Sequence, residues 1–221
     1  MKAKLVSYSK ATPEFEAEGL DNLQELIAYC AKVSNPANQI NKETSERLIK
    51  YLIKHQHWSP LEMVNATLEI ETTRDIAHQI VRHRSFSFQE FSQRYADPTT
   101  MEDWYTMREA RLQDTENRQN SIDTDDMELT IEWFKKQSEV QQASERAYRW
   151  AIDNNIAKEQ ARVVLPEGMT KTRLYMNGTI RSWVHYIELR GANGTQKEHL
   201  EIAHACAKII AEIFPLIEDI Q

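Results

Sequence analysis

The chain has 221 residues, of which 41% are hydrophobic and 28% charged, and its formal net charge is −7. This is the composition of an ordinary soluble globular protein with one domain over residues 1–221, and the acidic balance argues against general nucleic-acid binding. No apolar run approaches the roughly 20 residues that a bilayer-spanning helix needs, and the N-terminus lacks the apolar stretch of a signal peptide, so we expect a cytoplasmic protein without a membrane partner.

The first half of the chain switches between strand and helix periodicity. The pattern predicts a strand at 2–7, helices at 21–33 and 41–55, a strand at 64–72, and a helix from a Thr73 cap to about residue 84. The next segment, 85–97, has no clean period and is expected to be a loop or an irregular strand.

The second half is richer in helix. We expect a short strand at 104–107, a long helix from an Asp123 cap through 154 with its acidic face outward, a helix at 157–165, a strand at 172–176, a helix at 179–189, and a last helix from a Thr195 cap to 214. No internal repeat or linker divides the chain. The fold class indicated is a mixed α/β (α+β) domain.

Charge is unevenly distributed along the chain. Residues 101–145 hold twelve acidic and five basic residues, which accounts for the whole net charge. Two other stretches are locally basic: 74–94 has four Arg against two acidic residues, and 162–190 has four Arg and one Lys against two. Because Arg grips phosphate and carboxylate in a bidentate manner, these stretches favour a small anionic ligand over simple surface charge.

Glycine and cysteine usage excludes several kinds of site. The five glycines form neither a dinucleotide-binding G-x-G-x-x-G nor a P-loop, so side chains must hold any phosphate. Cys30 and Cys206 have no metal or redox spacing and are expected to be reduced, buried thiols. His55 and His57 lack an accompanying carboxylate or cysteine cluster, so we predict no metal site.

The densest functional signal lies in residues 79–95. On a helix, Gln79 is three residues from Arg82 and four from His83, so one helix end offers an amide, a guanidinium and an imidazole together. The segment after it adds three hydroxyls, a carboxylate and Arg94. This mixture suits a phosphorylated heterocycle, because Arg can bind the phosphate while the amide and backbone groups bind the ring edge.

These residues resemble a known family. Arg82-His83-Arg84, seven residues and then Ser92 is similar to the R-H-R-x7-S signature of flavin-dependent thymidylate synthases. Further resemblances follow the family's order: A-[RK]-V-S at 31–34, H-x-[TS]-P-x-E at 57–62, S-x-R-Y at 92–95, A-R-x-x-L-P at 161–166, and the closing-helix residues Arg181, Ser182, His185 and Arg190. The ordered set is far more specific than any one motif. The sequence departs from the family's usual residues at Met63, Gln89 and Thr179.

The resemblance implies a reaction and an architecture. The enzyme would convert dUMP to dTMP, with methylenetetrahydrofolate as the carbon donor and NADPH reducing FAD, and without an enzyme cysteine nucleophile. The expected fold is a single domain with a central, mainly antiparallel sheet flanked by helices, including one long helix. The family also implies a homotetramer whose active sites combine residues of different subunits.

It also implies a role for individual residues. Arg190 would lie beside the uracil and favour its ionised form, and His57 would lie near the flavin face. Ser92 is the third catalytic candidate, although no general base is spaced to activate it, which favours a binding role. FAD contacts are expected from Ser59, Arg82, His83, Arg84, Glu90, Thr179, Arg181 and His185. dUMP contacts are expected from Gln79, Arg82, Glu90, Phe91, Ser92, Gln93, Arg94, Arg162 and Arg190.

Two other classes of function compete with this one. A non-catalytic nucleotide-binding or regulatory protein could retain the same basic pocket without turnover. RNA binding through the Arg clusters is disfavoured by the acidic balance and by the lack of aromatic–basic interleaving. Among residues outside the motifs, we expect His199 and His204 to be surface or packing residues. The tryptophans are expected in the core: Trp104, Trp133, Trp150 and Trp183.

Overall fold

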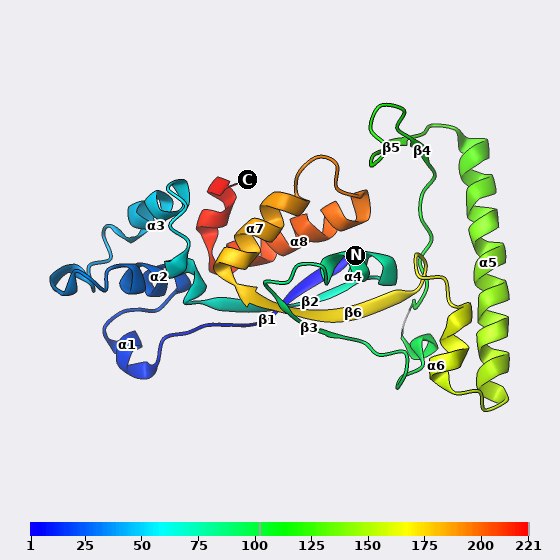
Figure 1. Ribbon diagram of the computed structural model, residues 1–221, viewed down its shortest axis with the longest axis horizontal. Helices are drawn as coiled ribbons and strands as arrows, with labels where there is room; N and C mark the ends of the chain where they lie inside the picture. Colours follow the sequence, from blue (N-terminus) through cyan, green and yellow to red (C-terminus); the bar gives the residue numbers. More distant parts are fainter. Residues whose placement is uncertain (102, 221) are drawn as a thin grey trace.

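A four-stranded antiparallel sheet forms the middle of the molecule in the computed structural model, which describes residues 1–101 and 103–220 (Figure 1). The strand order is β1-β2-β6-β3. The two central strands pair along nine residues, from Asn65 opposite Thr179 to Thr73 opposite Lys171. The strands are β1 Lys2–Tyr8, β2 Asn65–Thr73, β3 Ser87–Glu90 and β6 Lys171–Thr179.

Helices cover one face of this sheet. Alternate residues of β2, such as Ala66, Leu68 and Ile70, are fully buried, because successive side chains of a strand point to opposite faces. Three helices pack over the buried face and contact the strands. They are α4 Arg74–Ile80, α7 Ile180–Arg190 and α8 Lys197–Ile213. The core that results includes Trp183, whose indole Nε1 donates to the Ala66 carbonyl at 3.1 Å.

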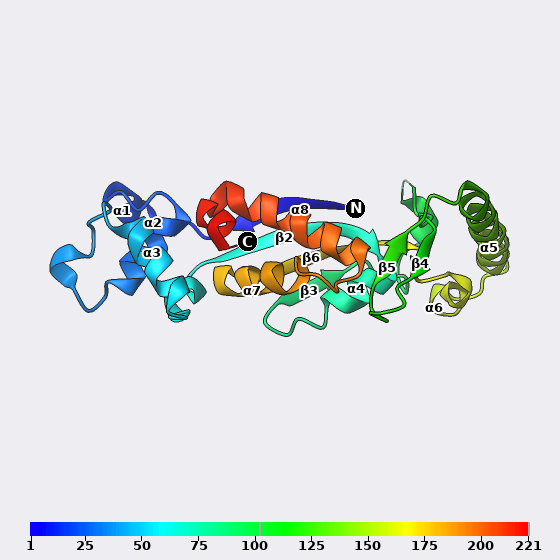
Figure 2. The same cartoon turned by 90° about the horizontal axis from the view of Figure 1, so that it is seen from above.

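The remaining helices lie at the two ends of an elongated molecule (Figures 1 and 2). At one end lie α1 Pro13–Ala17, α2 Leu23–Ala31 and α3 Ser45–Lys54. At the other lie the 27-residue α5 Met127–Asp153, the short α6 Lys158–Ala161 and a hairpin of β4 Arg111–Gln113 and β5 Ser121–Asp123. None of the helices in the described part of the chain is long and apolar enough to span a bilayer.

The architecture agrees with the sequence prediction of an antiparallel sheet flanked by helices, one of them long. The irregular segment after residue 84 does contain a strand, β3. The strand predicted at 172–176 is longer, because β6 extends on both sides to match β2 residue for residue. The helix predicted from Thr73 to about 84 already ends at Ile80.

Several local predictions were wrong. The segment 104–107 is not a strand; it contributes only an isolated bridge between Tyr105 and Thr170. The hairpin of β4 and β5 and the short α1 were not predicted. The cap of α5 is Asp126, whose carboxylate accepts from the Leu129 N–H at 2.9 Å, and not Asp123. The residue before α8 is Gln196, not Thr195, and it makes no side-chain cap.

Burial of the tryptophans and cysteines also differs from expectation. Trp183 is fully buried, but Trp133 and Trp150 on α5 are 44% and 61% exposed. Cys206 is buried as expected, whereas Cys30 is only half-buried. The α5 residues are exposed because that helix lies at the end of the molecule, away from the sheet (Figure 1).

Candidate functional site

The R-H-R motif lies where α4 ends and the chain turns back toward β3. The turn that follows α4 brings His83 beside the end of α7, and Arg190 Nε donates to His83 Nε2 at 2.9 Å. The turn is held against the β6–α7 junction, since Ser182 Oγ donates to the Ser85 carbonyl at 3.2 Å. Gly178 permits this approach: a Cβ there would lie 2.4 Å from a Phe86 ring carbon. The two Arg-rich stretches of the sequence therefore meet.

The imidazole of His83 is uncharged at neutral pH. Burial, followed by the positive charge of Arg190, lowers its pKa to about 4. Because Arg190 Nε only donates, His83 Nε2 accepts and the proton is on Nδ1. His83 also contacts the Tyr186 ring edge to face, with centroids 4.9 Å apart. This imidazole can therefore offer one fixed N–H to a ligand.

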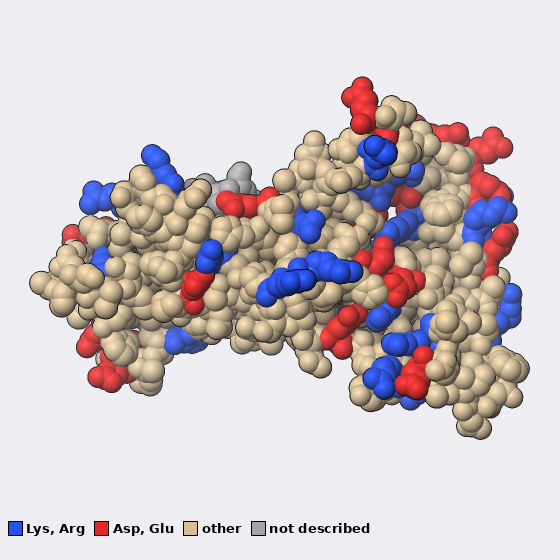
Figure 3. Space-filling model, viewed as in Figure 1, with Lys and Arg blue, Asp and Glu red and all other residues tan. Residues whose placement is uncertain are grey.

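The two arginines beside His83 have exposed side chains. Within the described part of the chain, the side chains of Arg82 and Arg84 form no hydrogen bond and no ion pair, although the Arg82 backbone N–H donates to the Gln79 carbonyl at 3.2 Å. Basic side chains are visible near the middle of the molecule in Figure 3, over α4 and the segment that leads to β3. Two unneutralised guanidinium groups beside a neutral imidazole form a surface suited to a phosphorylated ligand.

Glu90 is held by neighbours inside the molecule. Its Oε1 accepts from Arg74 Nη1 at 3.2 Å and from the Thr172 hydroxyl at 2.9 Å. The next residue, Phe91, donates its backbone N–H to the Arg173 carbonyl at 2.8 Å, which continues the pairing of β3 with β6. The start of the loop 90–94 is therefore anchored to the sheet.

The rest of that loop is a compact turn. The Ser92 hydroxyl accepts from the Arg94 N–H at 3.4 Å, and Arg94 pairs with Glu159 of α6 at 3.3 Å. Gln93 is only 3% exposed, yet its Nε2 has no hydrogen-bond partner in the described part of the chain. Arg162, which follows α6, is half-buried. An unsatisfied buried amide in this position fits a loop that is completed by a ligand or a neighbouring subunit.

A third group of predicted site residues lies at the start of α7. Trp58 packs edge to face on His185 with centroids 4.4 Å apart, and Arg181 pairs with Glu62. Ser59 begins the 3-10 turn that contains Glu62. His57 is exposed and lies 6.1 Å, ring to ring, from Tyr51.

The predicted site residues thus form three groups in one chain. One surrounds the end of α4 and includes His83 and Arg190, the second is the loop 90–94 with Arg162, and the third lies at the start of α7. Thr179 belongs to the third group and caps α7, because its hydroxyl accepts from the Ser182 N–H at 3.2 Å. No hydrogen bond or ion pair between the described side chains of predicted site residues joins one group to another.

Several polar residues that the sequence reasoning did not select also contact the site. Arg74 donates to Glu90. Gln196 accepts through Oε1 from Nε2 of the predicted site residue Gln79, at 2.7 Å. His199, expected only as a surface or packing residue, is fully buried and its Nδ1 lies 3.2 Å from Gln79 Oε1. The Gln196-x-Glu198 spacing at the start of α8 is a sequence signal that could have drawn attention to Gln196, and nothing comparable marked Arg74.

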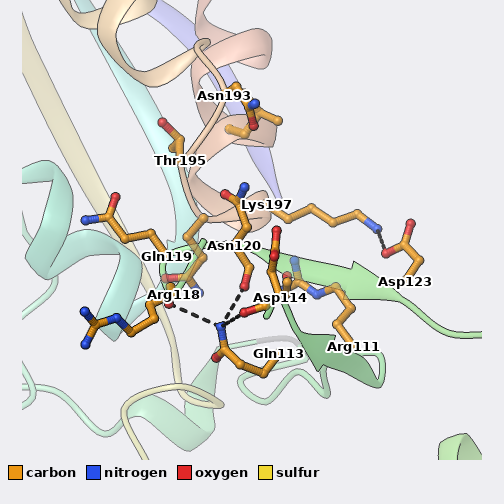
Figure 4. Close-up of a pocket in the computed structure, with 13 residues that line it drawn as sticks. Arg111, Gln113, Asp114, Arg118, Gln119, Asn120, Asp123, Asn193, Thr195 and Lys197 are labelled. Carbon is orange, nitrogen blue, oxygen red and sulfur yellow. Dashed lines mark hydrogen bonds and ion pairs between the residues drawn. The ribbon is translucent and has the colours of Figure 1, made fainter. Parts of the chain in front are cut away.

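A polar cavity of about 520 Å³ opens beside these residues, between the β4 hairpin and the loop before α8 (Figure 4). Gln196 and Arg111 line it, as does Lys197, which pairs with Asp123 at 3.3 Å. Its described lining includes none of the predicted site residues. Among the described residues, no three His, Cys, Asp or Glu side chains are grouped so that they could hold a metal ion.

The fold and the site indicate the class of protein: an α+β protein that presents arginines and a neutral imidazole to a nucleotide-like anion. The family model described as thymidylate synthase complementing protein matches residues 18–216. A flavin-dependent thymidylate synthase of a Synechocystis strain is 49% identical over 218 residues, covering 98% of this chain and 97% of that protein. The chain belongs to the flavin-dependent thymidylate synthase family.

Two further similarities agree with this assignment. A probable flavin-dependent thymidylate synthase of Paramecium bursaria Chlorella virus 1 is also 49% identical, over 217 residues, covering 98% of this chain and 97% of that protein. The crystal structure of a UMP/dUMP methylase, PolB from Streptomyces cacaoi, bound with 5-Br dUMP superimposes with a TM-score of 0.80 at 22% identity, covering 99% of this chain and 93% of that one. At that identity the second similarity supports the fold.

Proposed function

We propose that this member of the family converts dUMP to dTMP, with methylenetetrahydrofolate as the carbon donor and NADPH as the reductant of its FAD. The observation that supports this most is the contact of Arg190 with the neutral His83, between the exposed guanidinium groups of Arg82 and Arg84. These are the motif residues themselves, brought together from the turn after α4 and from the end of α7.

The residues present fit a bound FAD. Arg82 and Arg84, which have no partner in the described part of the chain, would bind its phosphates, and His83 would donate from Nδ1. Ser59, Glu90, Thr179, Arg181 and His185 would complete the cofactor contacts, and His57 would lie near the flavin face. Bound FAD would supply the hydride that the reaction requires.

The substrate would be held by a different set of groups. Arg94 and Arg162 suit the phosphate of dUMP, and the unsatisfied Nε2 of Gln93 offers a further donor. Arg190 would stabilise negative charge that develops on the uracil ring, because a fixed guanidinium costs little reorganisation during the reaction. The remaining substrate contacts would come from Gln79, Arg82, Glu90, Phe91 and Ser92.

Neither cysteine is suited to act as a nucleophile. Burial raises the pKa of Cys206 strongly and also raises that of Cys30, so both stay protonated near neutral pH. Ser92 accepts a backbone hydrogen bond, and none of the described side chains is a base within hydrogen-bond reach of it. A binding role for Ser92, with bond formation driven by cofactor chemistry, accounts for both facts.

The separation of the three residue groups supports a shared active site. The α5 helix exposes apolar side chains such as Ile131, Trp133 and Phe134, which are 40–50% exposed. Since exposed apolar surface on this scale favours association, we propose that α5 packs between subunits of a homotetramer. Different subunits would then bring the loop 90–94 and the motif of α4 to one ligand.

The cofactor test is a visible spectrum of the protein loaded with FAD and freed of excess, with and without dUMP. We expect a bound-flavin spectrum that changes when dUMP is added, followed by dTMP formation in an anaerobic assay with methylenetetrahydrofolate and NADPH. Failure to retain FAD under any condition would contradict the proposal, and a non-catalytic nucleotide-binding protein would become the better description.

Arg190→Lys tests the role of the guanidinium. We expect kcat to fall by about a hundredfold, as for loss of a group that stabilises charge in a transition state. Arg173→Lys is the matched control, because the Arg173 side chain pairs with Glu71 on the open face of the sheet and only its backbone contacts a predicted site residue. Equal activity of the two variants would exclude this role for Arg190.

Phe134→Asp tests the assembly. We expect the molar mass by light scattering to fall from that of a tetramer, and turnover to fall with it. Glu139→Gln, an exposed polar change on the same helix, should leave both unchanged. A Phe134→Asp protein of unchanged mass would remove α5 from the interface.

A further inference from the structure

A chain of side-chain hydrogen bonds leads from the β4 hairpin into the site. Arg111 of β4 pairs with Glu198 Oε1 in the first turn of α8. Gln196 Nε2 donates to Glu198 Oε2 at 2.8 Å, and Gln79 Nε2 donates to Gln196 Oε1 at 2.7 Å. The chain thus connects an arginine of the hairpin to the amide of α4 that we propose as a dUMP contact.

The same chain continues to α7. Gln79 Oε1 lies 3.2 Å from His199 Nδ1, and His199 Nε2 lies 3.2 Å from the Tyr186 hydroxyl. Glu198, His199 and Tyr186 are 8%, 0% and 1% exposed. Buried polar groups of this kind seldom remain unpaired. If donor and acceptor are exchanged in the hydrogen bond at one end, they must therefore be exchanged in each following hydrogen bond as well.

The ion pair of Arg111 with Glu198 fixes which group donates and which accepts in every hydrogen bond of this series. A guanidinium only donates and a carboxylate only accepts, so Glu198 must receive the amide N–H of Gln196. The oxygen of Gln196 then accepts from the amide N–H of Gln79, which leaves the oxygen of Gln79 facing His199. His199 must therefore carry its proton on Nδ1 and accept from Tyr186 at Nε2.

Independent electrostatics agree with a neutral His199. Burial, followed by the positive charge of Arg190, lowers its pKa to about 4. A neutral imidazole has one donor and one acceptor, and only one of its two tautomers satisfies both neighbours in the direction derived above.

We propose that Glu198 is a positioning residue for substrate binding, which acts through Gln196 to set the orientation of the Gln79 amide and the tautomer of His199. Gln79 then presents one N–H and one oxygen lone pair of fixed arrangement to the ligand. The role in substrate binding rests on the proposed function, whereas the direction of the chain does not.

The first experiment measures the wild-type holoenzyme and uses one variant only to assign the signals. In long-range proton–nitrogen NMR of protein labelled with nitrogen-15 at histidine, His199 should show the Nδ1–H tautomer, with its signals identified by their loss in His199→Asn. Detection of the Nε2–H tautomer or of a charged His199 would overturn the proposal. This result does not depend on dUMP, so it remains decisive if the proposed reaction fails.

Glu198→Gln should reverse the whole chain. The new amide would keep its oxygen toward Arg111 and offer its N–H to Gln196, so both other amides turn over and His199 changes to the Nε2–H tautomer. The N–H and the oxygen lone pair that Gln79 presents to the ligand would then exchange places. We expect the KM for dUMP to rise about tenfold with little change in kcat, because the Gln79 donor and acceptor would no longer match those of the substrate.

A double variant separates this role from a structural one. In Gln196→Glu with Glu198→Gln, the new carboxylate accepts from both Gln79 and the new amide, which restores the original direction although Arg111 loses its ion pair with residue 198. We expect the tautomer and the KM to return to wild-type values. If the ion pair with Arg111 were all that mattered, the double variant would stay impaired, and the proposal would fail.

Glu109→Gln is the matched control, because Glu109 also pairs with Arg111, at 3.5 Å, but lies outside the chain of amides. It should leave both the tautomer and the KM unchanged. An effect of Glu109→Gln equal to that of Glu198→Gln would likewise overturn the proposal. Should Glu198→Gln fail to fold, the wild-type tautomer and the double variant still decide the matter.

Discussion

The sheet and the α5 helix are stabilised in different ways. The sheet with α4, α7 and α8 encloses a core whose members, such as Leu68 and Trp183, are fully buried. The 27-residue α5 buries only four residues, and Gln137 and Ser144 are two of them. Gln137 exchanges two 2.8 Å hydrogen bonds with the backbone of Arg108. The sheet thus has its own apolar core. The α5 helix is attached by these polar contacts and by a small apolar cluster around Tyr148 and Ala151, and much of its apolar surface stays exposed.

Two tryptophan variants test this contrast with the largest expected effect. Trp183→Ala should lower the free energy of unfolding by about 3–5 kcal/mol, because it opens a cavity in the core and leaves the Ala66 carbonyl without its donor. Trp150→Ala on α5 should cost less than about 0.5 kcal/mol in urea unfolding of a dissociated chain. A large, concentration-dependent loss for Trp150→Ala would mean that assembly buries it.

Acid should destabilise the sheet region before it affects α5. The folded-state pKa values of His83 and His199 lie near 4, below the ordinary value of 6.5, so the unfolded chain binds more protons between these values. Stability is therefore fully present above about pH 6.5 and is lost as the pH falls toward about 4. His199→Gln should reduce the drop in urea midpoint between about pH 7.5 and about pH 5. The exposed His204 is the control, and His204→Gln should leave the drop unchanged.

The smallest effect is expected at the start of α5. Asp126→Ala removes the acceptor for the Leu129 N–H and should cost about 1 kcal/mol in urea unfolding. Asp123→Ala, at the residue that sequence reasoning selected as the cap, should cost less because its pairing with Lys197 is exposed. A greater loss at Asp123 would show that the helix begins earlier in solution.

Prediction from sequence succeeded where a local pattern was strong. The alternation of Ala66, Leu68 and Ile70 identified β2. The three- and four-residue spacing of Gln79, Arg82 and His83 assumed a helix to about residue 84, whereas α4 ends at Ile80 and the last two residues lie in the turn that follows. Prediction failed where the evidence was not local. The hairpin of β4 and β5 has little apolar periodicity, and the choice among the acidic residues before α5 depends on backbone geometry at Asp126.

The site shows the same division. The motif order was enough to identify the family and to nominate Arg82, His83 and Arg190. It could not show that Arg190 donates to His83, because those residues are 107 positions apart and meet only when α4 and α7 pack on one sheet. Nor could it select Glu198 or His199, whose importance lies in the direction of their hydrogen bonds.

The sequence by itself determined the periodicity of the main elements, the surplus of acid in residues 101–145 and the chemical groups of the motif, since these depend on neighbouring residues alone. The tertiary structure decided which groups share an environment. Burial and the proximity of Arg190 keep His83 neutral, a chain of amides links Glu198 to Gln79, and α5 lies away from the core. Solvation, charge proximity and hydrogen-bond direction are properties of the packed molecule, because they arise between residues that the chain order keeps far apart.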